Sequence, residues 1–371
     1  MKLNYEALNP RDKAVYDALA EHLFAMDSDV TIPGIDIAGN SWTPDDLVHE
    51  AVEAIRRDHP GFFNIPKWRC IYSPSSGTLQ IHFLYPLTMK QRDSANAIIE
   101  AYADWFIQQN AHLSDYDFAL AVFHWLTRNV TYIPLPRPGE NGLIDEIENA
   151  ELHNSVYGVF MHNESRCFGY AAAFSLLMQK RQIPASIVMA QLIGSRHVWC
   201  LCQIDGVWCH VDPCWADRRD RYSGEDVDMA AYVFFGMTEE EAVKDLRVDT
   251  QLSPRDMPFV PMYHNWPKAD LQTNTYYVRK GLLFQEQTYA QILDAIRNAL
   301  TVEPDDEKDI RISIRFRTRE ALESFREQHL RGLTSTVRQI NARRDHPIRF
   351  SSGRINSRFL TCDLFFVPID A

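Results

Sequence analysis

The sequence lacks the segments that mark a membrane or secreted protein. No apolar run in its 371 residues approaches the roughly 20 residues that a membrane span needs. The first residues, MKLNYEALNPRDKAVYDAL, contain no apolar core of the kind that a signal peptide has. The seven cysteines, an odd number without the spacing of a disulfide framework, favour a reducing compartment. We therefore expect a cytoplasmic protein.

The sequence also lacks an excess of positive charge and a loop built to hold phosphate. Its 38 lysines and arginines stand against 50 aspartates and glutamates, a formal charge of −12. This balance argues against nucleic acid or an anionic membrane as the main partner. There is no glycine-rich phosphate loop, no nucleotide-binding fingerprint and no low-complexity tract. We therefore expect no cofactor.

The chain is long enough to form two or three domains. We predict an α+β protein in which a central domain is flanked by two smaller α+β domains. The predicted domains cover residues 1–95, 96–265 and 266–371.

Both flanking regions alternate between helix and strand. In the first region, the patterns predict helices over 10–25 and 44–58, and a hairpin with strands over 67–73 and 78–85. A helix over about 88–110 leads into the central region. The last region predicts a β-α-β-α-β order, with elements over 274–279, 287–300, 309–317, 318–342 and 357–367.

Three short strings of the central region hold a candidate nucleophile, base and orienting group. They are RCFGYAAAF (166–174), SRHVWC (195–200) and HVDPCW (210–215), and they supply Cys167, His197 and Asp212. The apolar stretch after Cys167 predicts a helix, which Asn163 or Ser165 would cap. A thiol in the first turn of a helix lies near the positive end of the dipole, which favours the reactive thiolate. The three residues are therefore a candidate catalytic triad.

A tight turn predicts how His197 and Asp212 meet. Asp205-Gly206 is the strongest short-range hairpin signal, and antiparallel pairing across it sets Leu201 opposite His210. His197 and Asp212 then share a face as diagonal neighbours, with Cβ atoms about 7–8 Å apart. The other face is an unbroken apolar set, so a slip by one residue would bury the wrong side chains. The core pattern therefore predicts the register.

The three strings resemble the core of the transglutaminase-like superfamily. The family pattern is roughly C-x-G-Y-A-x-A-F, then H-x-W, then V-D-P-x-W, and this chain matches all three in order. The stretch 113–132 is similar to the helix that precedes the domain in bacterial members, so the resemblance covers roughly 113–240. The chain departs from the family at Cys200, where Asn is frequent, and at Cys214, where Thr is frequent.

The resemblance implies a papain-like geometry, with Cys167 at a helix N-terminus and the other two triad residues on adjacent strands. The Cys167 backbone N–H is an expected donor to an oxyanion. In the family, the second hydrogen-bond donor to the oxyanion is a side chain that precedes the cysteine in the sequence. Tyr157 is the candidate for this donor here. Trp199 and Trp215 are candidates to line the substrate cleft, although packing around the hairpin is an equally open interpretation.

A structural zinc site is a competing interpretation of the hairpin. Four cysteines and one histidine lie close together there: Cys200, Cys202, Cys209, Cys214 and His210. Zinc ligands usually follow a C-x₂₋₄-C spacing on a turn, whereas Cys200 and Cys202 are two residues apart on an apolar strand face. We therefore expect buried structural cysteines and no metal.

These interpretations predict a cysteine-dependent enzyme that acts on amide bonds of a peptide or protein substrate. Cys167 would form a thioester, which water or a second amine then resolves. The resemblance to bacterial members favours hydrolysis by a peptidase or amidase, and a cross-linking transglutaminase is the alternative that uses the same residues. A non-catalytic peptide-binding module is the alternative from another class. The substrate and the oligomeric state stay open at this stage.

Overall fold

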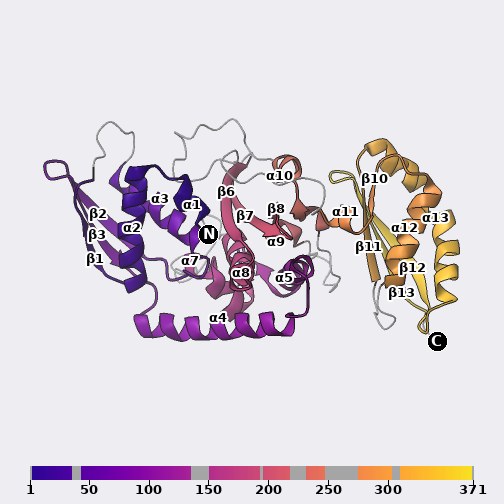
Figure 1. Cartoon of the computed structure of the whole chain (residues 1–371), viewed down its shortest axis with the longest axis horizontal. Helices are drawn as coiled ribbons and strands as arrows, with labels where there is room; N and C mark the ends of the chain where they lie inside the picture. Colours follow the sequence, from indigo (N-terminus) through magenta and orange to yellow (C-terminus); the bar gives the residue numbers. More distant parts are fainter. Residues whose placement is uncertain are drawn as a thin grey trace. The chain divides into compact units, whose positions relative to one another are not determined.

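The computed structural model describes residues 2–35, 43–134, 150–192, 195–217, 231–246, 275–302 and 310–369. The chain forms two compact units, Met1–Asp270 and Leu271–Ala371. Each unit combines helices with sheets, so the protein is α+β, as predicted (Figure 1). The domain boundaries placed after residues 95 and 265 stay predictions. Among the described helices, none is both long and apolar enough to span a membrane.

The first unit opens with a small sheet packed against helices. Its helices are α1 (Leu3–Ala7), α2 (Pro10–Ala25) and α3 (Pro44–Asp58), and its strands are β1 (Asp29–Ile32), β2 (Lys67–Ser73) and β3 (Thr78–Leu84). The sheet is antiparallel, in the order β1-β3-β2. The helices predicted over 10–25 and 44–58 are confirmed, and the predicted hairpin strands agree to within one residue.

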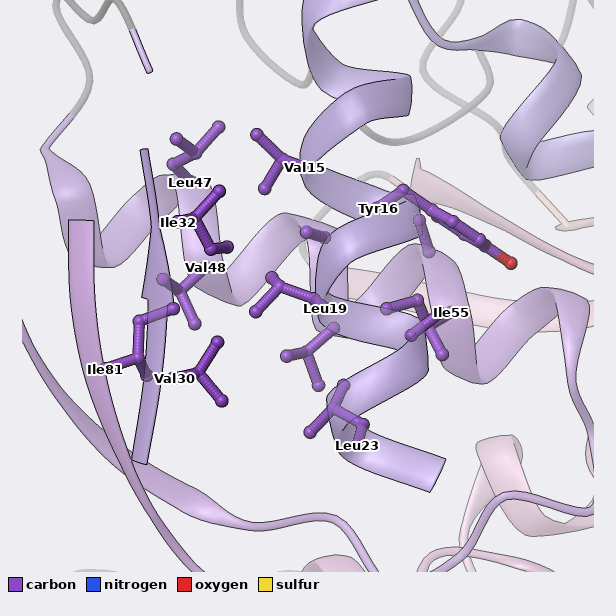
Figure 2. Close-up of a cluster of buried hydrophobic side chains, with 14 of the residues drawn as sticks. Val15, Tyr16, Leu19, Leu23, Val30, Ile32, Leu47, Val48, Ile55 and Ile81 are labelled. Carbon is purple, nitrogen blue, oxygen red and sulfur yellow. The ribbon is translucent and has the colours of Figure 1, made fainter. Parts of the chain in front are cut away.

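Caps and apolar spacing explain these elements. Thr43 and Asp46 form a capping box at the start of α3, where Pro44 occupies the first turn. The buried faces of α2 and α3 then meet the inner face of the sheet. Figure 2 shows Leu19 of α2 and Val30 of β1 in this shared hydrophobic core.

A helix that is buried on all sides lies at the centre of the first unit. The chain reaches it through α4 (Met89–Gln109), α5 (Asp115–Asn129), β4 (Thr131–Tyr132), α7 (Ala150–His153), the π-helix η1 (Gly158–His162) and β5 (Glu164–Ser165). The central helix is α8 (Cys167–Lys180), and every residue from Phe168 to Met178 is buried. A helix that is apolar all round belongs to a core. The first residue of α8, Cys167, is in contrast only partly buried.

The second sheet of this unit packs against α8. Its strands are β6 (Ala185–Leu192), β7 (Ser195–Ile204), β8 (Val207–Val211) and β9 (Phe235–Met237), antiparallel and in that order. Between or after them lie α9 (Pro213–Ala216), the 3₁₀ helix η2 (Tyr232–Phe234) and α10 (Glu239–Leu246).

The β7–β8 register agrees with the prediction. Leu201 pairs with His210, as expected from pairing across the turn. Asp205 and Gly206 both have positive φ angles, 50° and 80°. This combination is what a type I′ turn requires, and such a turn matches the twist of the strands that it joins.

Buried polar contacts attach the N-terminal helices to the second sheet. The Asn4 side chain donates to the Ile187 carbonyl of β6 at 3.3 Å and accepts from Arg57 Nε of α3 at 2.8 Å. Asp58 accepts hydrogen bonds from the Asn4 side chain and from the Tyr5 backbone, both at 2.8 Å. The N-terminal residues and the central helix are thus parts of one compact unit.

The second unit contains one mixed sheet with two long helices. Its elements are α11 (Tyr276–Arg279), β10 (Leu283–Phe284), α12 (Tyr289–Val302), β11 (Ile310–Phe316), α13 (Arg319–Asn341), β12 (Ile348–Asn356) and β13 (Thr361–Pro368). The sheet order is β10-β11-β13-β12.

One prediction for the second unit is wrong, and one strand was not predicted. The strand predicted over 274–279 is the helical turn α11, because Tyr277 is buried and its hydroxyl bonds to Ser313 Oγ at 3.1 Å. Packing overrides the strand propensity of its aromatic residues there. The strand predicted over 357–367 is present as β13, but its hairpin partner β12 was not predicted. Most side chains of β12 are exposed on both faces, so it lacks the alternation that marks a strand.

Candidate active site

A cavity of about 870 Å³ lies in the first unit, and Cys167 and His197 both line it. Part of its lining comes from α7, α8, β6 and β7. The rest comes from α3 between Asp45 and Arg56, from the start of β2 with the two residues before it, and from the end of β3 with the two residues after it. The nucleophile predicted from sequence therefore faces a space large enough for a substrate.

Cys167 is the first residue of α8 and is half-buried. The cap predicted for this helix is wrong, because Arg166 occupies the N-cap position and makes no side-chain cap bond. Ser165 instead donates its hydroxyl to the His153 carbonyl at 2.7 Å. The N–H groups of a first turn have no intrahelical acceptor. Those of α8 are therefore placed to donate to an anion beside the thiol.

A close approach explains the glycine two residues after Cys167. A Cβ atom added at Gly169 would lie 1.9 Å from Ser165 Oγ and 2.8 Å from the Ser155 carbonyl oxygen. Both distances are shorter than a van der Waals contact. Gly169 thus lets the segments before α8 pack against its first turn, next to the thiol.

His197 connects Cys167 to Asp212. It lies on β7 with 5% of its surface exposed, and its Nε2 is 2.6 Å from Asp212 Oδ2. Cys167 and His197 also lie close enough for each to shift the pKa of the other. Since Nε2 is used by Asp212, the nitrogen facing the thiol is Nδ1.

Asp212 lies one residue beyond the end of β8 rather than within it. It is fully buried and is the N-cap of α9, where its Oδ1 accepts the Trp215 N–H at 2.9 Å. Its own N–H donates to the Phe234 carbonyl at 2.8 Å. The carboxylate is thus held by one oxygen while the other meets His197, which fixes the orientation of the imidazole.

The electrostatics of this row favour a thiolate beside an imidazolium. Burial by itself raises the pKa of Cys167, but the hydrogen bond and the charge of His197 outweigh it and lower the thiol pKa below its usual value. Burial likewise lowers the pKa of His197, and the charge and hydrogen bond of Asp212 outweigh it, raising that pKa to about 10. Both shifts, the lowered pKa of Cys167 and the raised pKa of His197, favour the thiolate–imidazolium pair over the neutral pair.

The two tryptophans predicted to line the cleft lie against the histidine instead. The Trp199 ring stacks 6.0 Å from the His197 ring, and the Trp215 ring lies 5.1 Å from it. Tyr157 packs near Phe63, with ring centroids 5.6 Å apart. None of the three belongs to the described lining of the cavity. Their roles in holding substrate or an oxyanion stay predictions.

His210 occupies a buried position between two partners. Trp199 Nε1 donates to His210 Nδ1 at 3.1 Å, and His210 Nε2 lies 3.1 Å from Glu239 Oε2. Because Nδ1 accepts the indole proton, the proton of the neutral ring is on Nε2 and points to the carboxylate. His210 therefore holds the Trp199 ring in place and does not face Cys167, as His197 does.

The remaining hairpin cysteines have a buried apolar environment. Cys202 and Cys209 face each other across the strands, with their sulfurs 3.9 Å apart. Burial raises the pKa of Cys200 and of Cys202 above the usual range. Within the described ranges, no three or more histidine, cysteine or acidic side chains are grouped as a metal ion would need.

Sequence reasoning missed the contribution of the N-terminal helices to this site. Arg56 of α3 is buried, with its guanidinium 4.0 Å from the ring centroid of Phe168, the residue after Cys167. It donates to Glu53 Oε1 at 2.7 Å and to Glu151 Oε2 at 3.0 Å. The predicted helix over 44–58 was correct, but nothing in its pattern indicated which distant segment it would face.

Comparison with known proteins identifies the central region. Residues 106–213 match the family model of the transglutaminase-like superfamily. No curated protein matches the chain. Similar solved structures include a TGase, at 11% identity over 43% of this chain and 45% of that one, with a TM-score of 0.28. Another is a candidate cysteine protease from Cytophaga hutchinsonii, at 12% identity over 42% of this chain and 62% of that one, with a TM-score of 0.25.

The chain therefore spans less than two thirds of either solved structure. The family match does not depend on those two structures, and its range includes Cys167, His197 and Asp212. Residues 106–213 of this chain are a domain of the transglutaminase-like superfamily.

Proposed function

We propose that this protein is a cysteine-dependent enzyme that cleaves amide or peptide bonds through a thioester, with Cys167 as nucleophile, His197 as acid and base, and Asp212 as the orienting carboxylate. The observation that carries the proposal is the continuous row from thiol to imidazole to buried carboxylate, which begins on the wall of the cavity. A structural cysteine would need neither the imidazole nor the cavity.

The first half of the reaction forms the thioester. The Cys167 thiolate attacks the carbonyl carbon, and the negative charge moves to the carbonyl oxygen near the N-terminus of α8. His197 Nδ1 then gives its proton to the nitrogen of the leaving amine while the carbon–nitrogen bond breaks. The amine leaves and the acyl group stays on sulfur.

The second half releases the acyl group. Neutral His197 takes a proton from water, and the resulting hydroxide equivalent attacks the thioester carbon. The carbon–sulfur bond breaks, which regenerates the thiolate and the imidazolium that Asp212 stabilises. A primary amine in place of water would give transamidation with the same residues. The family match supports either outcome, and we propose hydrolysis because water is the more abundant nucleophile.

Thiol labelling tests the activated pair. Wild type and His197→Ala are treated with iodoacetamide across a pH series, and the modified sites are mapped by mass spectrometry. We expect selective modification of Cys167 at pH 5–6 in wild type and its loss in the variant. Cys70 is an internal control, because it is also half-buried but burial and Asp45 raise its pKa.

Incubation of the protein with peptides and a primary amine then distinguishes hydrolysis from transamidation. New peptide termini would indicate hydrolysis, and incorporation of a fluorescent primary amine would indicate transfer. If Cys167 labels no faster than Cys70, the catalytic proposal is wrong and a peptide-binding module takes its place.

A further inference from the structure

The N-terminal sheet ends in a strand whose outer edge meets no other described strand. β2 is the last strand in the order β1-β3-β2, and it pairs only with β3 in the part of the chain that the structure describes. Its first two residues, Lys67 and Trp68, also line the cavity that holds Cys167. The edge therefore begins at the candidate active site and runs away from it.

The hydrogen bonds of β3 determine which groups of β2 face this edge. Phe83 of β3 donates its N–H to the Ser28 carbonyl at 2.7 Å, on the β1 side of the strand. The main-chain groups of Phe83 therefore point away from β2, so Phe83 and its partner Trp68 form a non-hydrogen-bonded pair. Hydrogen-bonded and non-hydrogen-bonded pairs alternate along an antiparallel ladder, so Cys70 and Tyr72 also form non-hydrogen-bonded pairs with their β3 partners. The N–H and C=O groups of these three β2 residues therefore point to the outer edge.

The side chains along β2 suit an added strand. Those of Trp68, Cys70 and Tyr72 pack against the N-terminal core and are half-buried. On the opposite face, Ile71 is 70% exposed, and Leu84, which lines the cavity, is 51% exposed. An extended chain beside β2 would gain apolar contact with Ile71 as well as main-chain hydrogen bonds, whereas Leu84 lies on β3, one strand further from the edge.

We propose that the outer edge of β2 binds an extended segment of the peptide substrate by strand pairing and leads it into the cavity beside Cys167. This inference rests on the proposed function and adds a recognition surface outside the matched family domain, which begins at residue 106. Strand addition depends on hydrogen bonds to the main chain of the added peptide. It therefore favours extended peptides over small amide compounds that have no such main chain. Because the edge is continuous with the cavity, the substrate is its occupant rather than a second copy of this chain.

A pair of variants at Cys70 tests the edge in the full chain. Cys70→Pro removes an outward N–H, a position where an edge strand accepts proline without losing a ladder bond. Cys70→Ala removes the same thiol and keeps the N–H, so it is the matched control. Thermal unfolding checks that both variants are folded.

Two reagents that alkylate Cys167 separate recognition of a peptide chain from the reactivity of the thiol. Iodoacetamide reports the nucleophile alone, whereas acetyl-tetraalanyl chloromethyl ketone adds a peptide chain to the same alkylation, in which sulfur displaces halide. We expect Cys70→Pro to lower the ratio of the peptidyl rate to the iodoacetamide rate by about three- to tenfold, the effect of one hydrogen bond. Cys70→Ala should keep the wild-type ratio. Equal ratios in the two variants would overturn the proposal, and slow iodoacetamide labelling in every protein would overturn only the catalytic assignment.

Hydrogen exchange gives a readout without chemistry. In Cys167→Ala, saturation with acetyl-tetraalanine amide should slow exchange of the Trp68, Cys70 and Tyr72 amides and leave Arg69 and Ile71, which face β3, unchanged. The proposal fails if these amides show no added protection. It also fails if their protection depends on protein concentration in the absence of peptide, because the edge would then pair with a second copy.

Discussion

At the scale of single residues, the site depends on one imidazole that both neighbours pull toward the charged form. His197 is buried, which alone would make it neutral, yet Asp212 on one nitrogen and Cys167 on the other keep its proton. A proton that stays on the ring favours the thiolate form of Cys167. Each of the three side chains therefore changes the chemistry of the other two.

Turnover should depend on pH as a broad bell. The pKa of Cys167 is lowered, so the thiolate persists to lower pH than that of an ordinary cysteine and is lost as the pH falls through that lowered value. The pKa of His197 is raised to about 10, so the proton needed by the leaving amine is lost as the pH rises through about 10. Initial rates from pH 4 to 11 test this expectation, and an acid limb near pH 9 would contradict it.

Asp212→Asn should separate charge from packing. An asparagine can still cap α9, so the variant should fold, but burial would then make His197 neutral and raise the thiol pKa. We expect turnover to fall on the order of 10³–10⁴-fold, with loss of Cys167 labelling at pH 6. Circular dichroism and thermal unfolding are the controls, and labelling at the wild-type rate would refute the role of the carboxylate.

At the scale of elements, the turn between β7 and β8 shows what a sequence can predict. Asp205-Gly206 has a local conformational requirement, and the apolar face of the strands leaves one register, so the placement of His197 beside Asp212 followed from pattern alone. The start of α8 shows the opposite. Ser165 looked like a cap but is used by a distant carbonyl, that of His153, which no local pattern reveals.

Gly169→Ala tests the close packing around the first turn of α8. The new methyl group would overlap Ser165 Oγ and the Ser155 carbonyl, and we expect a loss of about 1–3 kcal/mol in the free energy of unfolding, the usual cost of overpacking. Gly61→Ala is the matched control, because its nearest neighbour would be Leu176 Cδ1 at an ordinary 3.8 Å. Denaturant unfolding of both variants measures the difference, and equal stability would show that the segment before α8 yields at little cost.

At the scale of the whole molecule, the cavity is a joint product of segments far apart in the chain. The family match covers residues 106–213, yet much of the lining comes from α3, β2 and the segment after β3. Sequence reasoning predicted the helix over 44–58 and the hairpin that follows it. It missed their place beside Cys167, because a docking surface depends on contacts such as Arg56 with Glu151 that have no periodic signal.

Arg56→Met should loosen this joint surface. Removing the guanidinium leaves Glu53 poorly compensated and removes the contact over Phe168, so we expect a destabilisation of about 3 kcal/mol. Arg326→Met breaks an exposed ion pair with Glu323 and should change stability by less than about 0.5 kcal/mol. Chemical unfolding compares the two. An equal, small effect would mean that the N-terminal helices are held mainly by their apolar contacts.

The double use of the Asp212 carboxylate has a consequence for how this protein tolerates variation. One oxygen starts the helix that follows the strand, and the other holds the imidazole. In a saturation library, Asn, Ser and Thr at this position should keep protein abundance through their capping ability, while only Asp keeps activity. Selection for abundance and selection for activity would then give different amino-acid profiles at a single codon.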